Sequence, residues 1–132
     1  MKVVKNNLNS IAAQLARETD IIANKTTTDI KASIIESMTG QKSGRVYEVQ
    51  GKKHQASAPG EAPARDTGNL INSITIDKAA NAHYIINFGA EYAVRLEYGT
   101  GRIQPRPFAR PAVKKHQYAF HAALRQLQSR LK

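Results

Sequence analysis

Apolar residues recur at the spacing of an α-helix over two long segments, one at each end of the 132-residue chain. In residues 4–38 they fall at steps that place them on one helical face: Leu8, Ile11, Leu15, Ile22, Ile30, Ile34 and Met38. Threonines at 26–28 interrupt this pattern, and β-branched residues are poor helix formers. We therefore expect either one long helix with a weak point there or two consecutive helices.

The C-terminal segment shows the same periodicity. Pro107 and Pro111 suit the first turn of a helix, where a missing N–H leaves no hydrogen bond unmade, so we predict a helix from about Ala109 onward. Its predicted apolar face carries Val113, Phe120, Leu124, Leu127 and Leu131. Its other faces carry Lys114, Lys115, Arg125 and Arg130.

Short strands are predicted between the two helices, at residues 45–50, 74–78 and 83–88. The last two alternate apolar and polar residues, and the four-residue link between them predicts a hairpin. Two short helices are expected, one containing Leu70 and Ile71 and one over residues 91–98 that ends at Gly99. The sequence thus predicts a single α+β domain over residues 1–132, with both long helices packed on an antiparallel sheet of three or four strands.

Residues 52–66 contain no large apolar side chain. They include Pro59, Gly60 and Pro63, so the segment is unsuited to bury surface and is predicted to be a long mobile loop. Loops of this length in compact domains are usually functional or disordered. We expect this loop to become ordered when the protein docks on a partner.

The chain is strongly basic, with 20 Lys and Arg against 10 Asp and Glu and a formal net charge of +10. No acidic residue follows Glu97. This asymmetry favours contact with nucleic acid or with an acidic protein surface, although a solvated basic face gives the same pattern. Because no zinc-finger, helix-turn-helix or RNA-recognition signature is present, the pattern favours nonspecific phosphate contact over base reading.

Residues with catalytic or metal-binding chemistry are sparse. The absence of cysteine excludes disulfides, Cys-ligated metals and thiol nucleophiles. His116 and His121 are five residues apart, so they do not share a helical face as a zinc-binding pair would. We therefore predict no enzymatic activity, no cofactor and no metal. No apolar run has the length of a signal segment or a membrane span, so we expect a soluble protein without a membrane partner.

Three stretches of the chain carry a family resemblance when they are taken in order. They are APGEAPARDTGNLINSI at 58–74, YAVRLEYGT at 92–100 and PRPFARPA at 105–112. Together they resemble the phage head–tail joining and tail-completion (neck) proteins of long-tailed phages, of the HK-type gp-ten-like kind. That pattern is a Pro/Gly loop, T-G-x-L-x-x-S-I, Y-A-x-x-x-E-x-G-T and R-P-F-x-x-P-A. The matching positions are Thr67, Gly68, Leu70, Ser73, Ile74, Tyr92, Ala93, Glu97, Gly99, Thr100, Pro107, Phe108 and Pro111.

The resemblance implies a structural role in a virion, with assembly in the host cytoplasm. Members are small α+β proteins that form rings, commonly of six subunits, between the head connector and the tail tube. The implied partners are further copies of the chain, a head-closure or connector protein and a tail-tube protein, with nonspecific DNA contact. A strongly basic lumen would hinder sliding DNA, so we expect the basic C-terminal helix to face a neighbouring subunit or an acidic ring beneath it.

Candidate interface residues come from two regions of the resemblance. The predicted loop supplies Pro59, Gly60, Glu61, Pro63 and Arg65. The second region supplies Arg95, Glu97, Thr100, Arg102 and Arg106. Glu97 lies among these arginines in the sequence, so we expect it to pair with an arginine, either within the subunit or across to a neighbour.

Two other functions compete with a neck subunit of a phage or prophage. A basic nucleic-acid-binding protein without a virion role would bind duplex DNA with a steep salt dependence. A small nuclease or toxin would lose its activity on substitution of one acidic or histidine residue, although the sequence nominates none. Portal, capsid and tail-tube genes beside this one would favour the neck subunit.

Overall fold

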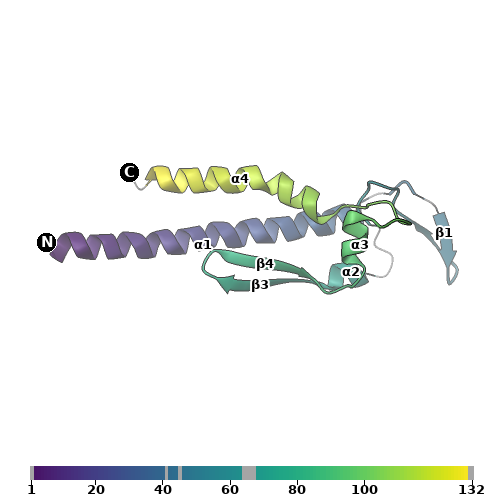
Figure 1. The fold of residues 1–132 in the computed structure, drawn as a ribbon, viewed down its shortest axis with the longest axis horizontal. Helices are drawn as coiled ribbons and strands as arrows, with labels where there is room; N and C mark the ends of the chain where they lie inside the picture. Colours follow the sequence, from purple (N-terminus) through teal and green to yellow (C-terminus); the bar gives the residue numbers. More distant parts are fainter. Residues whose placement is uncertain (1, 41, 45, 64–67, 131–132) are drawn as a thin grey trace.

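Two long helices dominate an elongated molecule. The structure is a computed structural model that describes residues 2–40, 42–44, 46–63 and 68–130. Helix α1 (Lys2–Thr39) runs along the long axis, and α4 (Ala109–Arg130) lies antiparallel to it on one side. The β3–β4 hairpin lies on the opposite side of α1, so α1 is the middle layer (Figure 1).

Helix α1 is continuous through the threonines, which confirms the single-helix alternative. The hydroxyls of Thr27 and Thr28 donate to the carbonyl oxygens of Ala23 and Asn24, at 2.8 and 2.9 Å. These bonds give each of the two hydroxyl groups a partner in the preceding turn of the same helix. The threonines therefore interrupt the apolar stripe without breaking the backbone.

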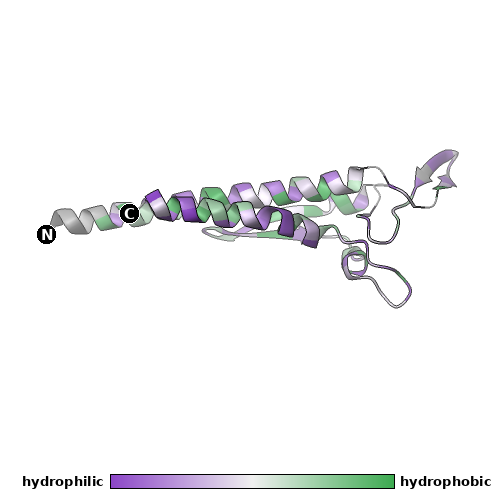
Figure 2. Ribbon diagram, turned by 90° about the horizontal axis from the view of Figure 1, so that it is seen from above, coloured by the Kyte–Doolittle hydropathy of each residue, from purple (hydrophilic) through white to green (hydrophobic). Residues whose placement is uncertain are grey.

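The strands form two separate two-stranded antiparallel sheets rather than one sheet. Strand β1 (Val46–Val49) pairs with β2 (Lys52–Gln55), and β3 (Ile74–Ala80) pairs with β4 (His83–Phe88). The predicted α+β class is confirmed: long helices lie at both ends, and the described residues between them contain four strands. The β1–β2 hairpin projects from one end of the molecule and is largely hydrophilic, so it has no apolar face with which to extend the other sheet (Figure 2).

Strand β2 corrects the prediction that residues 52–66 form one loop. Gln50 and Gly51 both have positive φ, at 52° and 79°, which is the geometry of a two-residue hairpin turn. The sequence prediction missed β2 because its residues, KKHQ, show no alternation of apolar and polar side chains.

The rest of the predicted loop, as far as Pro63, is fastened to the segment that follows α1. The Gly44 N–H donates to the Ala56 carbonyl at 3.0 Å, and a Cβ added at Gly44 would lie 2.5 Å from that oxygen. Ser57 and Pro63 are buried. Residues 64–67, which include Arg65 and the Thr67 of the resemblance, lie outside the described residues.

The hydrophobic core lies at the C-terminal end of α1. There α1 meets the short helices α2 (Asn69–Asn72) and α3 (Ala93–Tyr98), the start of α4 and the end of β4. The buried cluster consists of Ile34, Met38, Leu70, Ile74, Ala93, Phe108 and Ala112. The rings of Phe88 and Phe108 meet edge to face, with centroids 5.2 Å apart. Ile34 and Met38, which the sequence places on the apolar face of the N-terminal helix, are thus part of the core.

Other residues of the predicted apolar faces are exposed. Helix α1 has 38 residues and α4 has 22, which corresponds to about 57 and 33 Å at the α-helical rise. Arg130, at the end of α4, pairs with Glu18 at 3.3 Å, so the first part of α1 extends past its partner. Leu8, Ile11 and Leu15 are therefore exposed. Val113 is exposed as well, because Ala112 takes the inward position on α4.

Candidate functional site

A tight turn after α3 begins the region in which the matching stretches meet. Gly99 ends α3 with φ 75°, as the sequence predicts, and a Cβ there would lie 2.8 Å from the Ile103 carbonyl oxygen. Thr100 N–H donates to that oxygen at 2.8 Å. The Thr100 hydroxyl accepts from the N–H groups of Arg102 and Ile103, at 3.2 and 3.1 Å. Only glycine fits position 99, and Thr100 closes the turn.

The chain then returns against α3 and against the segment that contains Pro59. The Arg106 N–H donates to the Leu96 carbonyl at 2.6 Å, and the Gly60 N–H donates to the Pro105 carbonyl at 2.9 Å. These bonds bring together three stretches that are separate in the sequence: residues 58–63, 92–100 and 105–112. Residues 58–63 and residues 92–100 therefore both contact residues 105–112, at one end of the molecule.

Glu97 is the centre of this junction. Its side chain is buried, and the residue is 5% exposed. Its carboxylate accepts from the backbone N–H groups of Phe108, Ala109 and Arg110, at 2.8, 3.0 and 2.9 Å. It therefore caps the N-terminus of α4, whose first N–H groups have no partner within the helix.

Arg110 completes the cap. Its Nε donates to Glu97 Oε1 at 2.9 Å, and its Nη2 donates to the Glu97 carbonyl oxygen at 2.8 Å. The predicted pairing of Glu97 with an arginine thus occurs within the subunit. Its partner is Arg110, rather than one of the arginines that surround Glu97 in the sequence.

The environment of Glu97 keeps its carboxylate charged. Burial acts to raise the pKa of Glu97, but the backbone N–H bonds and the Arg110 guanidinium outweigh burial and hold the pKa below its usual value. Because both carboxylate oxygens are occupied by donors, this group acts as a structural anchor and is not available as a proton acceptor for another molecule.

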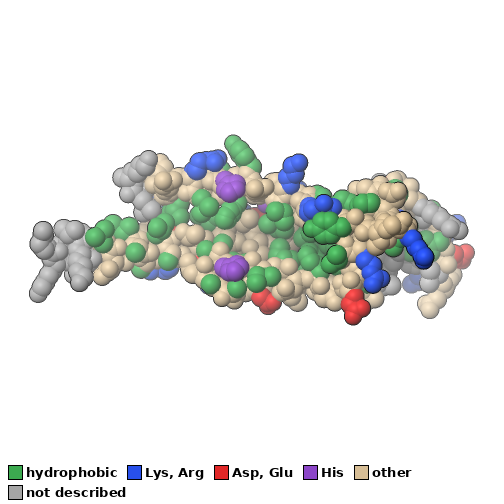
Figure 3. All heavy atoms as spheres, in the orientation of Figure 1, with side chains coloured by type: hydrophobic (Ala, Val, Ile, Leu, Met, Phe, Trp, Pro, Cys, Tyr) green, Lys and Arg blue, Asp and Glu red, His purple; other side chains and the backbone are tan. Residues whose placement is uncertain are grey.

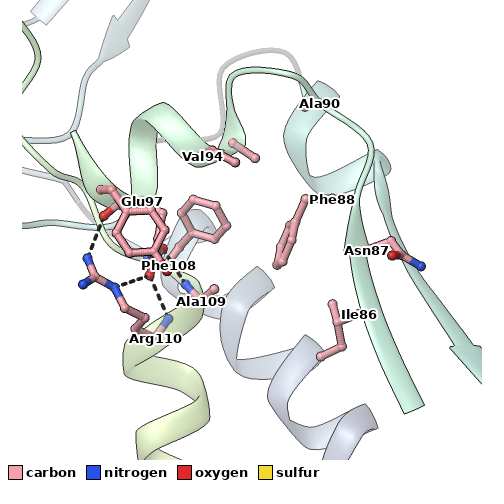
Figure 4. Close-up of a pocket in the computed structure, with 11 residues that line it drawn as sticks. Ile86, Asn87, Phe88, Ala90, Val94, Glu97, Phe108, Ala109 and Arg110 are labelled. Carbon is pink, nitrogen blue, oxygen red and sulfur yellow. Dashed lines mark hydrogen bonds and ion pairs between the residues drawn. The ribbon is translucent and has the colours of Figure 1, made fainter. Parts of the chain in front are cut away.

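A groove lies beside the cap, between β4 and α3. It encloses about 320 Å³. Ile86 and Phe88 of β4 form one wall, and Phe108 and the Glu97–Arg110 pair form the other (Figure 4). Val94 and Tyr98 of α3 are exposed at this groove. Its lining is mostly apolar, so the junction combines a rigid polar cap with an open apolar surface.

The candidate interface residues differ in exposure. Pro59, Gly60, Arg95, Thr100 and Arg102 are exposed. Glu61 and Arg106 are half-buried, whereas Pro63 and Glu97 are buried. Arg65 lies outside the described residues. Apart from Arg65, the candidate residues of the predicted loop and those of the second region lie at the same end of the molecule. The Gly60 N–H, which donates to the Pro105 carbonyl, joins the two regions there.

Glu61 anchors its segment in the way that Glu97 anchors α4. Its carboxylate accepts from the Ser43 hydroxyl and from the backbone N–H groups of Ser43 and Ala58, the latter two at 3.2 and 2.9 Å. The Ser43 hydroxyl, together with these N–H groups, lowers the pKa of Glu61. Glu61 therefore fixes the segment after β2 to the segment after α1.

Sequence reasoning missed two residues that position the long elements. Asp20 on α1 accepts from the Ala82 N–H at 2.8 Å, from the Tyr84 hydroxyl at 3.0 Å and from Lys78 Nζ at 3.0 Å, which holds the β3–β4 hairpin on α1. His116 Nε2 lies 2.6 Å from Ser33 Oγ and links α4 to α1. Neither contact has a local sequence signal, because each joins residues more than 50 positions apart.

Within the described residues, no group of three or more His, Cys, Asp or Glu side chains is placed to hold a metal ion. In the same part of the chain, no helix combines the length and the apolar character needed to cross a membrane. The chain matches no protein-family model, no curated protein and no solved structure.

Proposed function

We propose that this chain is a structural, non-catalytic subunit of a homo-oligomeric ring at the head–tail connection or the tail end of a tailed phage or prophage. In this role it would assemble in the host cytoplasm and remain in the virion. Its neighbours would be further copies of itself, a head-closure or connector protein and a tail-tube protein.

The exposed surface of the subunit carries this proposal. It measures 9478 Å², whereas a compact monomer of 14.5 kDa exposes about 6,900 Å². The surplus, about 2,600 Å², exceeds the roughly 1,600 Å² that one subunit buries in two contacts of standard size. A subunit that contacts two neighbours in a ring would use surface of this extent.

Part of this surplus is an apolar face on the first half of α1. We call Leu8, Ile11 and Leu15 the α1 apolar arm; they share one side of the helix and are exposed. Most of the stability of helices in proteins comes from packing of their apolar face, and this face is exposed in the single subunit. Packing against another copy would cover these apolar side chains, and the same contact would stabilise the helix.

The resemblance to neck proteins supports the location of the ring. Three of the matching residues form one local structure: Glu97 caps the helix that follows the R-P-F sequence, and Gly99 and Thr100 shape the turn between them. The groove and the exposed Val94 and Tyr98 at this end offer a surface for a second protein.

The experiment is to place a stop codon at Leu8 in an inducible source element and to examine the lysate by negative-stain electron microscopy. We expect filled heads separated from tails if the ring joins the two, or tails of irregular length if it completes the tail. A synonymous change at the same codon is the control. Normal infectious particles from the stop-codon strain would overturn the proposal.

A further inference from the structure

The outward side of α4 carries a continuous row of cationic and aromatic side chains. Arg110, Lys114, Tyr118, His121 and Arg125 recur at steps of four, four, three and four, which places them on one helical face. All five are exposed, and Tyr118 is 77% exposed. We call these residues the α4 basic face. They lie opposite the side that carries the buried Ala112 and Leu127.

No negative charge interrupts this face. Residues 109–130 contain no Asp or Glu. Arg110 pairs with Glu97, whereas Lys114 and Arg125 form no ion pair within the part of the chain that the structure describes. In Figure 3, Lys and Arg side chains project along the edge formed by α4, where no acidic side chain is seen, whereas the opposite edge and one end carry both acidic and basic side chains. The edge formed by α4 is therefore cationic.

Tyrosine rings hold two of the cations in place. The guanidinium carbon of Arg110 lies 4.4 Å from the centroid of the Tyr98 ring, and that of Arg125 lies 6.0 Å from the centroid of Tyr118. Such cation–π contacts restrict long arginine side chains without removing their charge. Less side-chain entropy is then lost when these cations meet an anion.

From this arrangement we infer that the α4 basic face binds the phosphate backbone of double-stranded DNA. From Arg110 to Arg125 the row spans about 22 Å, and one DNA strand places about six phosphates along that length. The Tyr118 hydroxyl adds a hydrogen-bond donor of the kind that contacts phosphate. A straight, convex row suits a duplex better than a flexible single strand, which usually binds in a groove lined with stacking aromatic side chains.

The composition of the face favours DNA over an acidic protein. The centre of a protein–protein interface is apolar and depleted of charge. On the α4 basic face the only large apolar group is the Tyr118 ring, whereas the exposed aliphatic residues Leu8, Ile11 and Leu15 lie on the α1 apolar arm. The two surfaces therefore fit different partners, and the composition of the α4 basic face favours a nucleic-acid contact over the protein neighbour that we expected from the sequence.

This inference goes beyond the ring role, because it concerns the free subunit and holds whether or not a ring forms. Three cations without an ion pair in the described residues are placed to contact phosphates: Lys114, Arg125 and the adjacent Lys115, whereas Arg110 is already paired with Glu97. Counterion release then predicts that log K falls against log[salt] with a slope of about −3. Between 50 and 200 mM salt, the affinity should fall by about 40-fold.

The experiment measures fluorescence anisotropy of a labelled 30-base-pair duplex of arbitrary sequence with the full-length chain over that salt range. The test variant is K114Q/R125Q; the matched control is K52Q/K53Q, which removes the same charge from the exposed strand β2 of the projecting β1–β2 hairpin. We expect K114Q/R125Q to bind at least tenfold more weakly at 50 mM salt, and to reduce the slope by about 2. The control should keep the slope of the unaltered chain. Circular dichroism checks that both variants stay folded.

Three results would overturn the inference. One is the absence of duplex binding at 50 mM salt. Another is an equal loss of affinity in K114Q/R125Q and K52Q/K53Q, which would mean that net charge alone attracts DNA. The third is competition by polyglutamate as effective as competition by unlabelled duplex at equal charge, which would indicate a surface for acidic protein.

Discussion

The two halves of α1 carry the same apolar spacing but have different surroundings. In the second half, Ile34 is 1% exposed, because the start of α4 and the short helices cover it. In the first half, Leu8 is 62% exposed on a helix that continues past the end of α4. Periodicity thus identifies which face of a helix is apolar, while the lengths of neighbouring elements decide whether that face is covered within the subunit. We interpret the uncovered half as a surface for another copy.

Truncating an apolar side chain in each half tests this comparison most strongly. Ile34→Ala leaves a cavity in a filled core and should lower the free energy of unfolding by about 2–5 kcal/mol. Leu8→Ala, the matched change in the exposed half, should alter the unfolding of the dilute subunit by less than about 0.5 kcal/mol. Urea titration followed by circular dichroism measures both. Equal destabilisation by the two changes would contradict the division of α1.

Removing the charge of Glu97 tests the cap that closes the covered end. Glu97→Gln keeps the shape but weakens three backbone bonds and the pair with Arg110, so we expect a loss of about 2 kcal/mol. Chemical denaturation at neutral pH measures this loss. Glu91→Gln, an exposed carboxylate in the preceding turn, is the control and should have little effect. A Glu97→Gln variant as stable as the unaltered chain would mean that the cap is not needed.

The pH dependence of stability should also report on Glu97. Although burial acts to raise its pKa, the hydrogen bonds lower it below the unfolded value, so the unfolded chain binds the proton more readily. Its contribution is complete above the unfolded pKa of about 4.5 and is lost as the pH falls through the lower pKa of the folded carboxylate. Thermal unfolding between pH 3 and 7 should therefore show that the melting temperature falls less steeply toward low pH in Glu97→Gln than in the unaltered chain. The same dependence of melting temperature on pH in both proteins would contradict this assignment.

Gly99→Ala should have a smaller effect at the same end. The positive φ and the contact of the new Cβ with the Ile103 carbonyl predict a loss of about 1–2 kcal/mol. Gly101→Ala, at a position with open space around it and no positive φ, is the matched control. Thermal unfolding of the two variants compares them directly. A larger effect at Gly101 would show that the turn is described wrongly.

The smallest effect is expected where the covered half of α1 meets the uncovered half. Asp20 fastens the β3–β4 turn, and Asp20→Asn should weaken the bonds to Lys78 and Ala82 while leaving the core intact. Hydrogen exchange should become faster in residues 78–84 and stay unchanged around Ile34. Lys25→Gln, which removes an exposed pair on α1, is the control. Faster exchange throughout the core would mean that the hairpin and the core open together.

The sequence predicts well where local chemistry decides the structure. The β3–β4 hairpin follows from alternating side chains, the end of α3 from Gly99, and the start of α4 from its prolines. Strand β2 was not predicted because its residues, KKHQ, show no alternation of apolar and polar side chains. The inward face of α4 is rotated from the predicted one, since Ala112 and His116 meet α1 instead of Val113.

The candidate site is less predictable, since it depends on contacts between distant segments. The sequence singles out Glu97 and an arginine partner, but it does not indicate that the partner is Arg110 or that the carboxylate caps α4. That arrangement requires the chain to turn back at Gly99, which brings Arg106 against Leu96. The α4 basic face likewise could not be predicted from the sequence, because it is defined by which side of α4 packs on α1.

The mass of the protein in solution tests the central claim most directly. Sedimentation equilibrium of the full-length chain should give one discrete mass that is a multiple of 14.5 kDa. The triple variant L8D/I11D/L15D should sediment as a folded monomer. Val113→Asp, which changes an exposed apolar residue on α4, should retain the larger mass. A monomeric mass for the unaltered chain at every concentration, or an unchanged mass in the triple variant, would contradict self-association through the α1 apolar arm.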